Sequence, residues 1–245
     1  MTSLLRVDRL SKRYGGLHAV RDVSFDIESG QIVGLIGDNG AGKTTLFNLL
    51  SGFVTPSSGR VRFQADEITR WSPERRAQAG LVRTFQRSRI FPEVSVEQNV
   101  RMGCFLRERR RFVDRLRLLR GSPRSMEERV DELLDLTGLA AFRQTLAAHL
   151  SFGYQRRLAV AVALGADPQM MLLDEPFGGL SPTSAEQMGT LIHALHERGM
   201  TLLLIEHRME SIVASCDRLL VMQGGELIIP RSPAETEREA PHALG

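Results

Sequence analysis

The sequence predicts an α/β fold in which a parallel sheet is joined to an N-terminal antiparallel β subdomain and an inserted α-helical subdomain. Continuous apolar runs at 32–36 and 170–173 are typical of strands that are buried on both faces. Alternating apolar and polar residues at 4–10 and 20–27 are typical of half-buried strands. From about 89 to 150 the strand patterns give way to helical periodicity.

Composition places the chain among ordinary globular proteins. Its 245 residues are 25% charged and 42% apolar, enough for one domain with a sizeable core. The net charge of +3 does not by itself indicate a nucleic-acid or membrane partner. The two cysteines cannot form a disulfide framework, so we expect a reducing compartment. No apolar run approaches the ~20 residues that a membrane span needs.

The first third of the chain alternates turns with strands. Tyr14-Gly15-Gly16 is a turn between the two alternating strands, and the apolar run that begins at Ile32 follows another turn at Gly30. Gly52 is expected to end the first helix. Short strands are expected at 60–63 and at 81–86, the latter ending at Gln86.

Capping signals mark the later helices. Ser125 and Glu128 form a capping box, and Gly138 ends that helix pattern. Ser181-Pro182 occupies N-cap and N1 positions of another helix, which Gly199 ends. A buried strand at 201–205 and a hairpin around Gly224-Gly225 are expected to complete the fold.

A glycine-rich loop at 37–44 is the most informative stretch. It matches the pattern G-x-x-x-x-G-K-[ST] and lies between a predicted buried strand and a predicted helix. Such a loop points backbone N–H groups at a phosphate, Lys43 reaches the β- and γ-phosphates, and Thr44 offers a hydroxyl to Mg²⁺. The residues assigned to phosphate binding are Gly37, Asn39, Gly40, Ala41, Gly42, Lys43, Thr44 and Thr45.

Polar residues at other strand ends complete a candidate hydrolytic site. Asp174 is expected to hold Mg²⁺ and Glu175 to deprotonate the attacking water. His207 follows the next strand and is expected to bind the γ-phosphate, and the Gln86 amide is expected to ligate Mg²⁺ or water. Tyr14 is expected to stack on adenine. Each alone would be a routine core, cap or surface residue, so the assignment depends on the whole set.

This set resembles the ABC transporter ATPases in order and spacing, from about Leu4 to Ile229. The resemblance implies a P-loop NTPase (RecA-like) core. Further stretches resemble the branched-chain (hydrophobic) amino acid importer ATPases. The motifs that resemble the ABC transporter ATPases are Tyr14, Gly37–Thr44, Gln86, Leu150-Ser151-Phe152-Gly153, Asp174-Glu175-Pro176 and His207. The stretches that resemble the amino acid importer ATPases are Val82-Arg83-Thr84-Phe85-Gln86, Arg89-Ile90-Phe91 and Leu204-Ile205-Glu206-His207.

The resemblance also implies partners. It implies a head-to-tail dimer with an identical or paralogous ATPase subunit, in which Ser151 and Gly153 donate to the γ-phosphate bound by the other subunit. Transmembrane permease subunits would dock near Gln86 and the helical lobe, and a solute-binding protein would act indirectly. The protein would lie peripherally on the cytoplasmic face of the cell membrane, with no nucleic-acid partner.

The same resemblance divides the single nucleotide-binding domain, 1–245, into lobes. Residues 1–87 and 155–245 would form the catalytic lobe, and 88–154 the helical subdomain, which carries the family motif at its end. The chain departs from the family pattern at Phe152, Tyr154, Ser181 and Arg208. We expect Tyr154, in place of glutamine, to weaken ATP-dependent closure of the isolated subunit.

Several alternatives stay open at this point. The basic stretch from Arg107 to Arg120 is interpreted as a solvated helix face, with contact to anionic lipid as the second reading and nucleic acid as the third. Competing functions are a lipopolysaccharide-type exporter ATPase, a urea or amide importer ATPase, a mechanical ATPase on ribosomes or DNA, and a regulatory cassette with little turnover. The transported solute is not encoded in these motifs.

Overall fold

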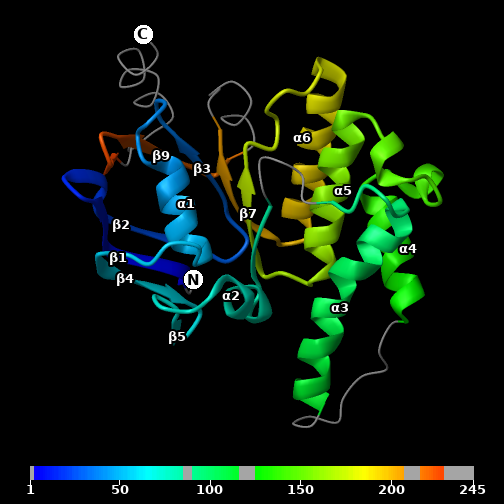
Figure 1. Cartoon of the computed structure of the whole chain (residues 1–245), viewed down its shortest axis with the longest axis horizontal. Coiled ribbons are helices and arrows are strands. Elements are labelled where there is room, and N and C mark those ends of the chain that lie inside the picture. Colours follow the sequence, from blue (N-terminus) through cyan, green and yellow to red (C-terminus); the bar gives the residue numbers. More distant parts are fainter. Residues whose placement is uncertain (1–2, 85–89, 116–124, 207–215, 229–245) are drawn as a thin grey trace.

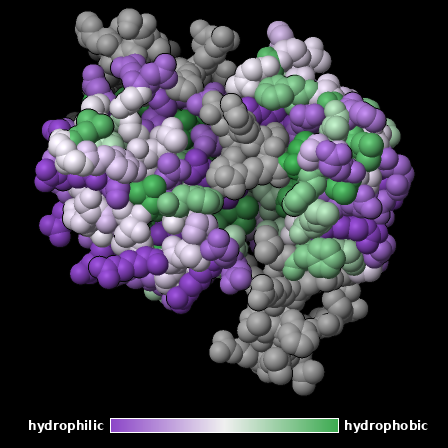
Figure 2. Space-filling view, in the orientation of Figure 1, coloured by the Kyte–Doolittle hydropathy of each residue, from purple (hydrophilic) through white to green (hydrophobic). Residues whose placement is uncertain are grey.

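The computed structural model describes residues 3–84, 90–115, 125–206 and 216–228, and within 106–115 it describes the backbone alone. Figure 1 shows a β-rich half that contains the N-terminus and a helical half beside it. Hydrophilic residues cover the outer margins of both halves, and hydrophobic residues collect toward the middle of the face in Figure 2. Among the described residues, none of the helices combines the length and the apolar character required to cross a bilayer.

The N-terminal strands form the antiparallel sheet that their alternating pattern predicts. Gly15-Gly16 makes a two-residue turn, across which Tyr14 pairs with Leu17. Buried positions such as Leu5 and Val7 face the core, while the residues between them face solvent. The described strands have the order β2-β1-β4-β5, with bounds β1 (Ser3–Tyr14), β2 (Leu17–Glu28), β4 (Ser58–Phe63) and β5 (Asp66–Glu67).

The second sheet contains the strands that end at the candidate site. Its described strands have the order β10-β9-β3-β8-β7-β6 and are parallel except for the last hairpin. The two predicted apolar runs and the predicted closing hairpin are therefore confirmed. The bounds are β3 (Ile32–Ile36), β6 (Leu81–Arg83), β7 (Met170–Asp174), β8 (Thr201–Ile205), β9 (Arg218–Gln223) and β10 (Glu226–Ile228).

Alternate residues of this parallel sheet enter two different hydrophobic cores. On β7, Met170 and Leu172 belong to the core shared with the antiparallel sheet, whereas Met171 and Leu173 belong to the core shared with the helical half. Since a strand turns successive side chains to opposite faces, the fully buried strands are apolar at every position.

The helices cover both faces of the parallel sheet. α1 lies on the side of the antiparallel sheet, and α5 and α6 lie on the other side (Figure 1). The predicted capping box at Ser125 and the predicted N-cap at Ser181 are both present. The helices are α1 (Lys43–Ser51), α2 (Pro73–Ala79), α3 (Val96–Arg115), α4 (Met126–Leu136), α5 (Phe152–Gly165) and α6 (Pro182–Glu197), with 3₁₀ turns η1 (Ala140–Phe142) and η2 (Ala147–His149).

The sequence patterns did not identify α2, although its start carries the same signal as α6. Ser72 is the N-cap, its side chain accepts a hydrogen bond from the Arg75 N–H, and Pro73 opens the helix.

The structure describes no side chains between Arg107 and Arg115 and does not describe residues 116–120. The interpretation of this basic stretch as a solvated helix face therefore stays a prediction.

Arg76 connects α2 to the end of α1 by hydrogen bonds. Its side chain is 1% exposed and donates to the carbonyls of Leu49 and Leu50 at 2.7 and 2.6 Å, and to those of Thr69 and Trp71 at 3.0 and 3.2 Å. The last carbonyls of a helix lack partners within it and carry partial negative charge. Burial lowers the pKa of Arg76 to about 10, still well above neutral, so the guanidinium caps α1 as a cation.

We predict that Arg76→Met lowers the free energy of unfolding by about 3 kcal/mol, because it leaves several buried carbonyls without a donor. The matched control is Arg75→Met, since Arg75 is exposed and stacks on the Trp71 ring, an interaction worth about 1 kcal/mol or less. Urea unfolding of both variants measures the difference. Equal losses would contradict the capping role of Arg76.

Candidate active site

The glycine loop connects β3 to α1, as its sequence context predicts. Gly37, Gly40 and Gly42 have φ values of 150°, 83° and 103°, which disfavour residues with a side chain. Space is restricted as well. A Cβ at Gly37 would lie 2.1 Å from the Met222 carbonyl oxygen, and one at Gly42 would lie 2.2 Å from that of Ala19. The loop is therefore enclosed between β9 and β2. Conformation and packing both require glycine at 37 and 42, whereas Gly40 has open space around it and is favoured by its backbone conformation.

Lys43 begins α1 and turns its ammonium back toward the loop. The group donates to the carbonyls of Gly37 and Asp38, the latter at 2.8 Å, and the residue is 5% exposed. Burial lowers the pKa of Lys43, and the negative charges of Glu175 and Asp38 oppose that shift. The Lys43 ammonium is thus held at the loop by two carbonyls, where the phosphates of a nucleotide are expected to bind.

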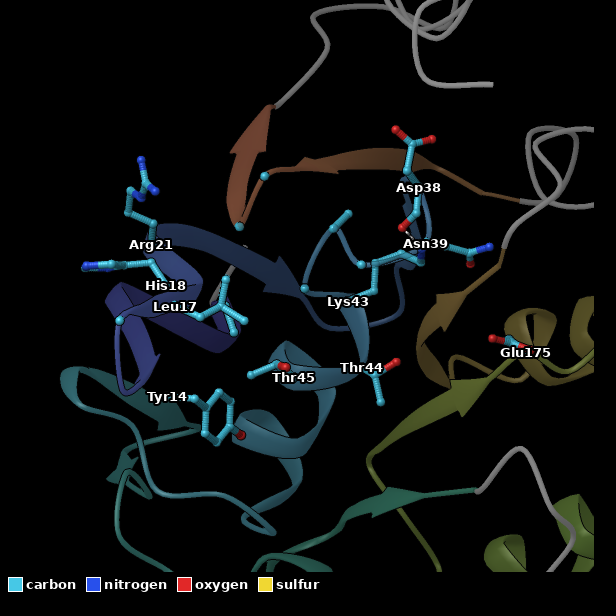
Figure 3. A pocket seen from close by; sticks show the side chains of 17 residues that line it. Tyr14, Leu17, His18, Arg21, Asp38, Asn39, Lys43, Thr44, Thr45 and Glu175 are labelled. Atoms are coloured by element: carbon cyan, nitrogen blue, oxygen red, sulfur yellow. Dashed lines mark hydrogen bonds between the residues drawn. The ribbon is translucent and has the colours of Figure 1, made fainter. Parts of the chain in front are cut away.

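A cavity of about 750 Å³ joins the loop to the adenine-stacking candidate. Figure 3 shows Tyr14 on one side of the loop and Glu175 on the other, with Thr44 between them. Tyr14 is 48% exposed, so part of its ring surface is open to a ligand. The predicted residues that line the cavity are Tyr14, Asn39, Gly40, Ala41, Gly42, Lys43, Thr44, Thr45 and Glu175.

The cavity also has lining residues that sequence patterns missed. Leu17 and His18 follow the Gly15-Gly16 turn, and Leu17 is the register partner of Tyr14. Gly225 closes another side by accepting from the Arg21 N–H at 2.7 Å and donating to the loop carbonyl of Ala41 at 3.0 Å. The two-residue turn was the available signal for Leu17, whereas the approach of Gly225 depends on tertiary structure alone.

The parallel register brings the acidic residues to the same edge as the loop. Leu35 of β3 pairs with Ile205 of β8, which pairs with Asp174 of β7. The strand carrying Glu175 is therefore separated from the loop strand by β8. Glu175 has φ 49°, a left-handed conformation rarely adopted by a residue with a long side chain. Its N–H donates to the Ile205 carbonyl at 3.0 Å, which fixes this turn at the strand end.

Asp174 is buried, and one of its carboxylate oxygens accepts a hydrogen bond from Arg83 at 2.7 Å. Thr44 is exposed in the first turn of α1. A carboxylate and a hydroxyl are hard oxygen donors, and Mg²⁺ is commonly held by one or two protein groups together with substrate phosphates. The described residues contain no cluster of three or more His, Cys, Asp or Glu for a metal. This donor set fits Mg²⁺ that arrives with a nucleotide.

Glu206 is a buried acid that sequence patterns did not assign to the site. It is 4% exposed, and its Oε1 accepts from the Phe177 N–H at 2.8 Å. The contact connects the end of β8 to the segment that follows Glu175.

Gln86, His207 and Arg208 lie outside the described residues, so the expectations for them stay predictions.

The start of α5 has an exposed face suited to an anion. Ser151 is its exposed N-cap and makes no side-chain capping hydrogen bond, and Phe152 is 48% exposed. Gly153 has a packing role within the chain: a Cβ there would lie 2.6 Å from the Ser184 hydroxyl oxygen on α6. Ser181 accepts from the Ser184 N–H at 3.3 Å, which fixes the beginning of α6 next to it.

Tyr154 makes contacts within its own chain that its sequence position did not predict. Its ring packs against Phe142 of the same chain, with ring centroids 4.3 Å apart, and the Arg157 guanidinium carbon lies 4.3 Å from the ring centroid. The ring also packs against the core of the helical half. Tyr154 thus stabilises its own subunit, which favours a packing role for the ring over the expected role as a brake on closure.

Comparisons with known proteins agree with this geometry. The model of the ABC transporter family matches residues 20–178. BraF of Pseudomonas aeruginosa, a high-affinity branched-chain amino acid transport ATP-binding protein, is 35% identical over 245 residues, covering 98% of this chain and 96% of BraF. LptB of Acidithiobacillus ferridurans, a lipopolysaccharide export system ATP-binding protein, is 35% identical over 235 residues, covering 96% and 92%.

The fold is also similar to a solved structure. The crystal structure of the ADP conformation of MJ1267, an ATP-binding cassette of an ABC transporter, aligns with a TM-score of 0.84 at 28% identity. The alignment covers 100% of this chain and 98% of that one.

We predict that Glu175→Gln and Glu175→Asn both reduce ATP hydrolysis about 10²–10⁴-fold, because each removes the carboxylate base. They should differ in stability. Asparagine tolerates the left-handed backbone better than glutamine, so Glu175→Asn should be more stable by about 1 kcal/mol. Urea unfolding and a phosphate-release assay provide the two readouts. Near-normal turnover in either variant would remove Glu175 from the role of base.

We predict that Tyr154→Gln lowers the free energy of unfolding by about 1–2 kcal/mol, because it removes an aromatic contact within the chain. It should not strengthen ATP-dependent dimerisation. Tyr154→Phe, which keeps the ring, serves as the control and should remain close to the parent. Thermal unfolding and a sizing column with ATP measure both effects, and a tighter dimer with unchanged stability would restore the interface interpretation.

Proposed function

The chain belongs to the ABC transporter family as an ATP-binding and ATP-hydrolysing subunit, and we propose that it powers the import of branched-chain or other hydrophobic amino acids at the cytoplasmic face of a membrane. The observation that supports its catalytic part is the common edge at which the glycine loop, Asp174 and Glu175 lie, next to a cavity that also reaches Tyr14. The amino acid part rests on the similarity to BraF.

In the proposed site each group acts on a different part of ATP. Tyr14 stacks on adenine, the loop N–H groups and Lys43 hold the phosphates, and Glu175 deprotonates the attacking water. His207, which follows β8 in the sequence, contacts the γ-phosphate. Thr44, Gln86 and Asp174 hold Mg²⁺, which neutralises charge on the phosphates when bound.

We further propose that the subunit acts as a head-to-tail dimer with a copy of itself or a paralogue. The exposed N-cap Ser151 and the N–H groups that open α5 would contact the γ-phosphate bound by the other subunit. This proposal is supported by the absence of a side-chain capping bond at Ser151, which leaves its hydroxyl available to a partner. Gly153 then serves two purposes, close packing against α6 within the chain and close approach to the partner's ATP.

An apolar groove between the catalytic and helical lobes is the proposed docking site for a permease. It has a volume of about 410 Å³ and lies between β6, α3 and α5. Three large apolar side chains on it, Phe91, Met102 and Phe105, are 54%, 39% and 60% exposed. Exposed apolar side chains grouped in a groove are typical of protein contact sites. In the predicted division of the chain, β6 and most of α5 belong to the catalytic lobe, 1–87 and 155–245. α3 belongs to the helical subdomain, 88–154, so the groove lies between the two predicted lobes.

Lipopolysaccharide export is the second candidate function. LptB is as similar in percentage identity as BraF, and the ATP site is expected to be the same in both systems. The short stretches that include Arg83 and Glu206 favour the amino acid importers. Direction and solute are properties of the membrane subunits, so the partner decides between the candidates.

We predict that the affinity-tagged chain, purified with membranes from its own host, captures a branched-chain amino acid permease. Phe105→Ser should reduce capture by about 10–30-fold, because a buried aromatic contact contributes about 2 kcal/mol at an interface. Phe53→Ser is the control, since Phe53 is 47% exposed but lies away from the groove lining. Mass spectrometry identifies the captured permease.

Radiolabelled leucine uptake by cells provides the functional readout. Cells that carry only the Glu175→Gln variant should lose high-affinity uptake. Capture of lipopolysaccharide-export membrane proteins, together with unchanged leucine uptake, would establish the second candidate instead.

A further inference from the structure

A buried arginine contacts the proposed metal-binding carboxylate. Arg83 ends β6 and Asp174 ends β7, and these neighbouring strands are parallel. The Arg83 Nη2 donates to Asp174 Oδ2 at 2.7 Å, and the two side chains are only 6% and 9% exposed. An ion pair so well shielded from water is much less screened than the surface pairs of this protein. It therefore fixes the carboxylate more firmly than a surface partner would.

The same guanidinium also holds the helix that follows the glycine loop. Its Nη1 donates to Asn48 Oδ1 at 2.7 Å and to Ser51 Oγ at 3.0 Å, and its central carbon lies 5.6 Å from the Phe47 ring centroid. Asn48 and Ser51 are three residues apart and lie on one face of α1. The planar fork of arginine suits such a junction, because it directs several donors at fixed angles.

These contacts join the two elements that carry the groups expected to share Mg²⁺. Thr44 lies in the first turn of α1, and Asp174 lies at the end of β7. Arg83 bonds to both elements at once, so it sets the distance between them. A buried carboxylate without a partner is strongly disfavoured, so the ion pair with Arg83 also holds the Asp174 side chain in one position. The neighbouring lysine cannot replace Arg83, because the Lys43 ammonium is bonded to the loop carbonyls.

We propose that Arg83 is a positioning residue that aims Asp174 at the metal site beside Thr44, and that it acts on the metal through Asp174 and not on the nucleotide itself. This inference rests on the proposed role of Asp174 in binding Mg²⁺. Arg83 precedes Gln86, the other predicted ligand on this segment, by three residues. The start of that segment is thereby anchored to Asp174 and to α1, the helix that also carries Thr44.

The test compares nucleotide binding with metal binding in the same variants. Fluorescent ATP is titrated in EDTA to measure binding without a divalent ion, and Mn²⁺ is titrated into the ATP complex with detection by electron paramagnetic resonance. Arg83→Met should leave ATP affinity in EDTA within about twofold, since the loop and Lys43 are intact. It should weaken Mn²⁺ binding at least tenfold, and Arg83→Lys should restore part of that loss.

Two further variants separate this inference from the proposed function. Asp174→Asn should weaken Mn²⁺ binding by itself, and an unchanged Mn²⁺ affinity would refute the role of Asp174. The double variant Arg83→Met with Asp174→Asn should bind Mn²⁺ as Asp174→Asn alone does, because Arg83 then has no carboxylate to aim. This double variant also replaces a buried ion pair by neutral groups, a change that folded proteins commonly tolerate.

The inference fails under two results. Additive losses of Mn²⁺ affinity in the double variant would show that Arg83 acts independently of Asp174. A loss of ATP affinity in EDTA as large as the loss of Mn²⁺ affinity would show that Arg83 only supports the packing of α1.

Discussion

The parallel register of β3, β8 and β7 is the constraint on which the site depends. Leu35, Ile205 and Asp174 lie in one row across these strands, so the segments that follow them emerge at one edge. The glycine loop leaves that edge from β3, Glu206 from β8 and Glu175 from β7. A shift of one residue in any pair would turn the alternating apolar side chains away from their cores, which makes the register costly to change.

Buried polar side chains then hold the segments around this edge. Arg76 binds the carbonyls at the end of α1, Arg83 joins α1 to Asp174, and Glu206 binds the backbone beyond Glu175. Each of these contacts connects two elements that are distant in sequence. Because a buried charge without a partner is strongly disfavoured, such contacts tolerate little relative movement of the elements. The elements that carry the site, β7, β8 and α1, are therefore expected to move as one body with α2 and β6 when ATP binds.

The helical half has a different character at its surface. Ser151 and Phe152 are exposed at the start of α5, and Phe91 and Phe105 are exposed along the groove beside α3. The interior of the same half is well packed, and Tyr154, which is partly buried, packs against it. This contrast fits a subunit that has a stable fold alone but completes its surfaces with partners, as the proposed dimer and permease contacts require.

The sequence by itself determined the fold class, the phosphate loop and the acidic strand end, because each depends on local periodicity and motif spacing. The cap at Ser125 and the turn at Gly15 could be predicted for the same reason. Only the tertiary structure decided that Tyr154 packs inward, that Leu17 lines the nucleotide cavity and that Arg83 pairs with Asp174. Those facts depend on contacts between residues far apart in the chain, and no local pattern records which distant side chain a residue meets.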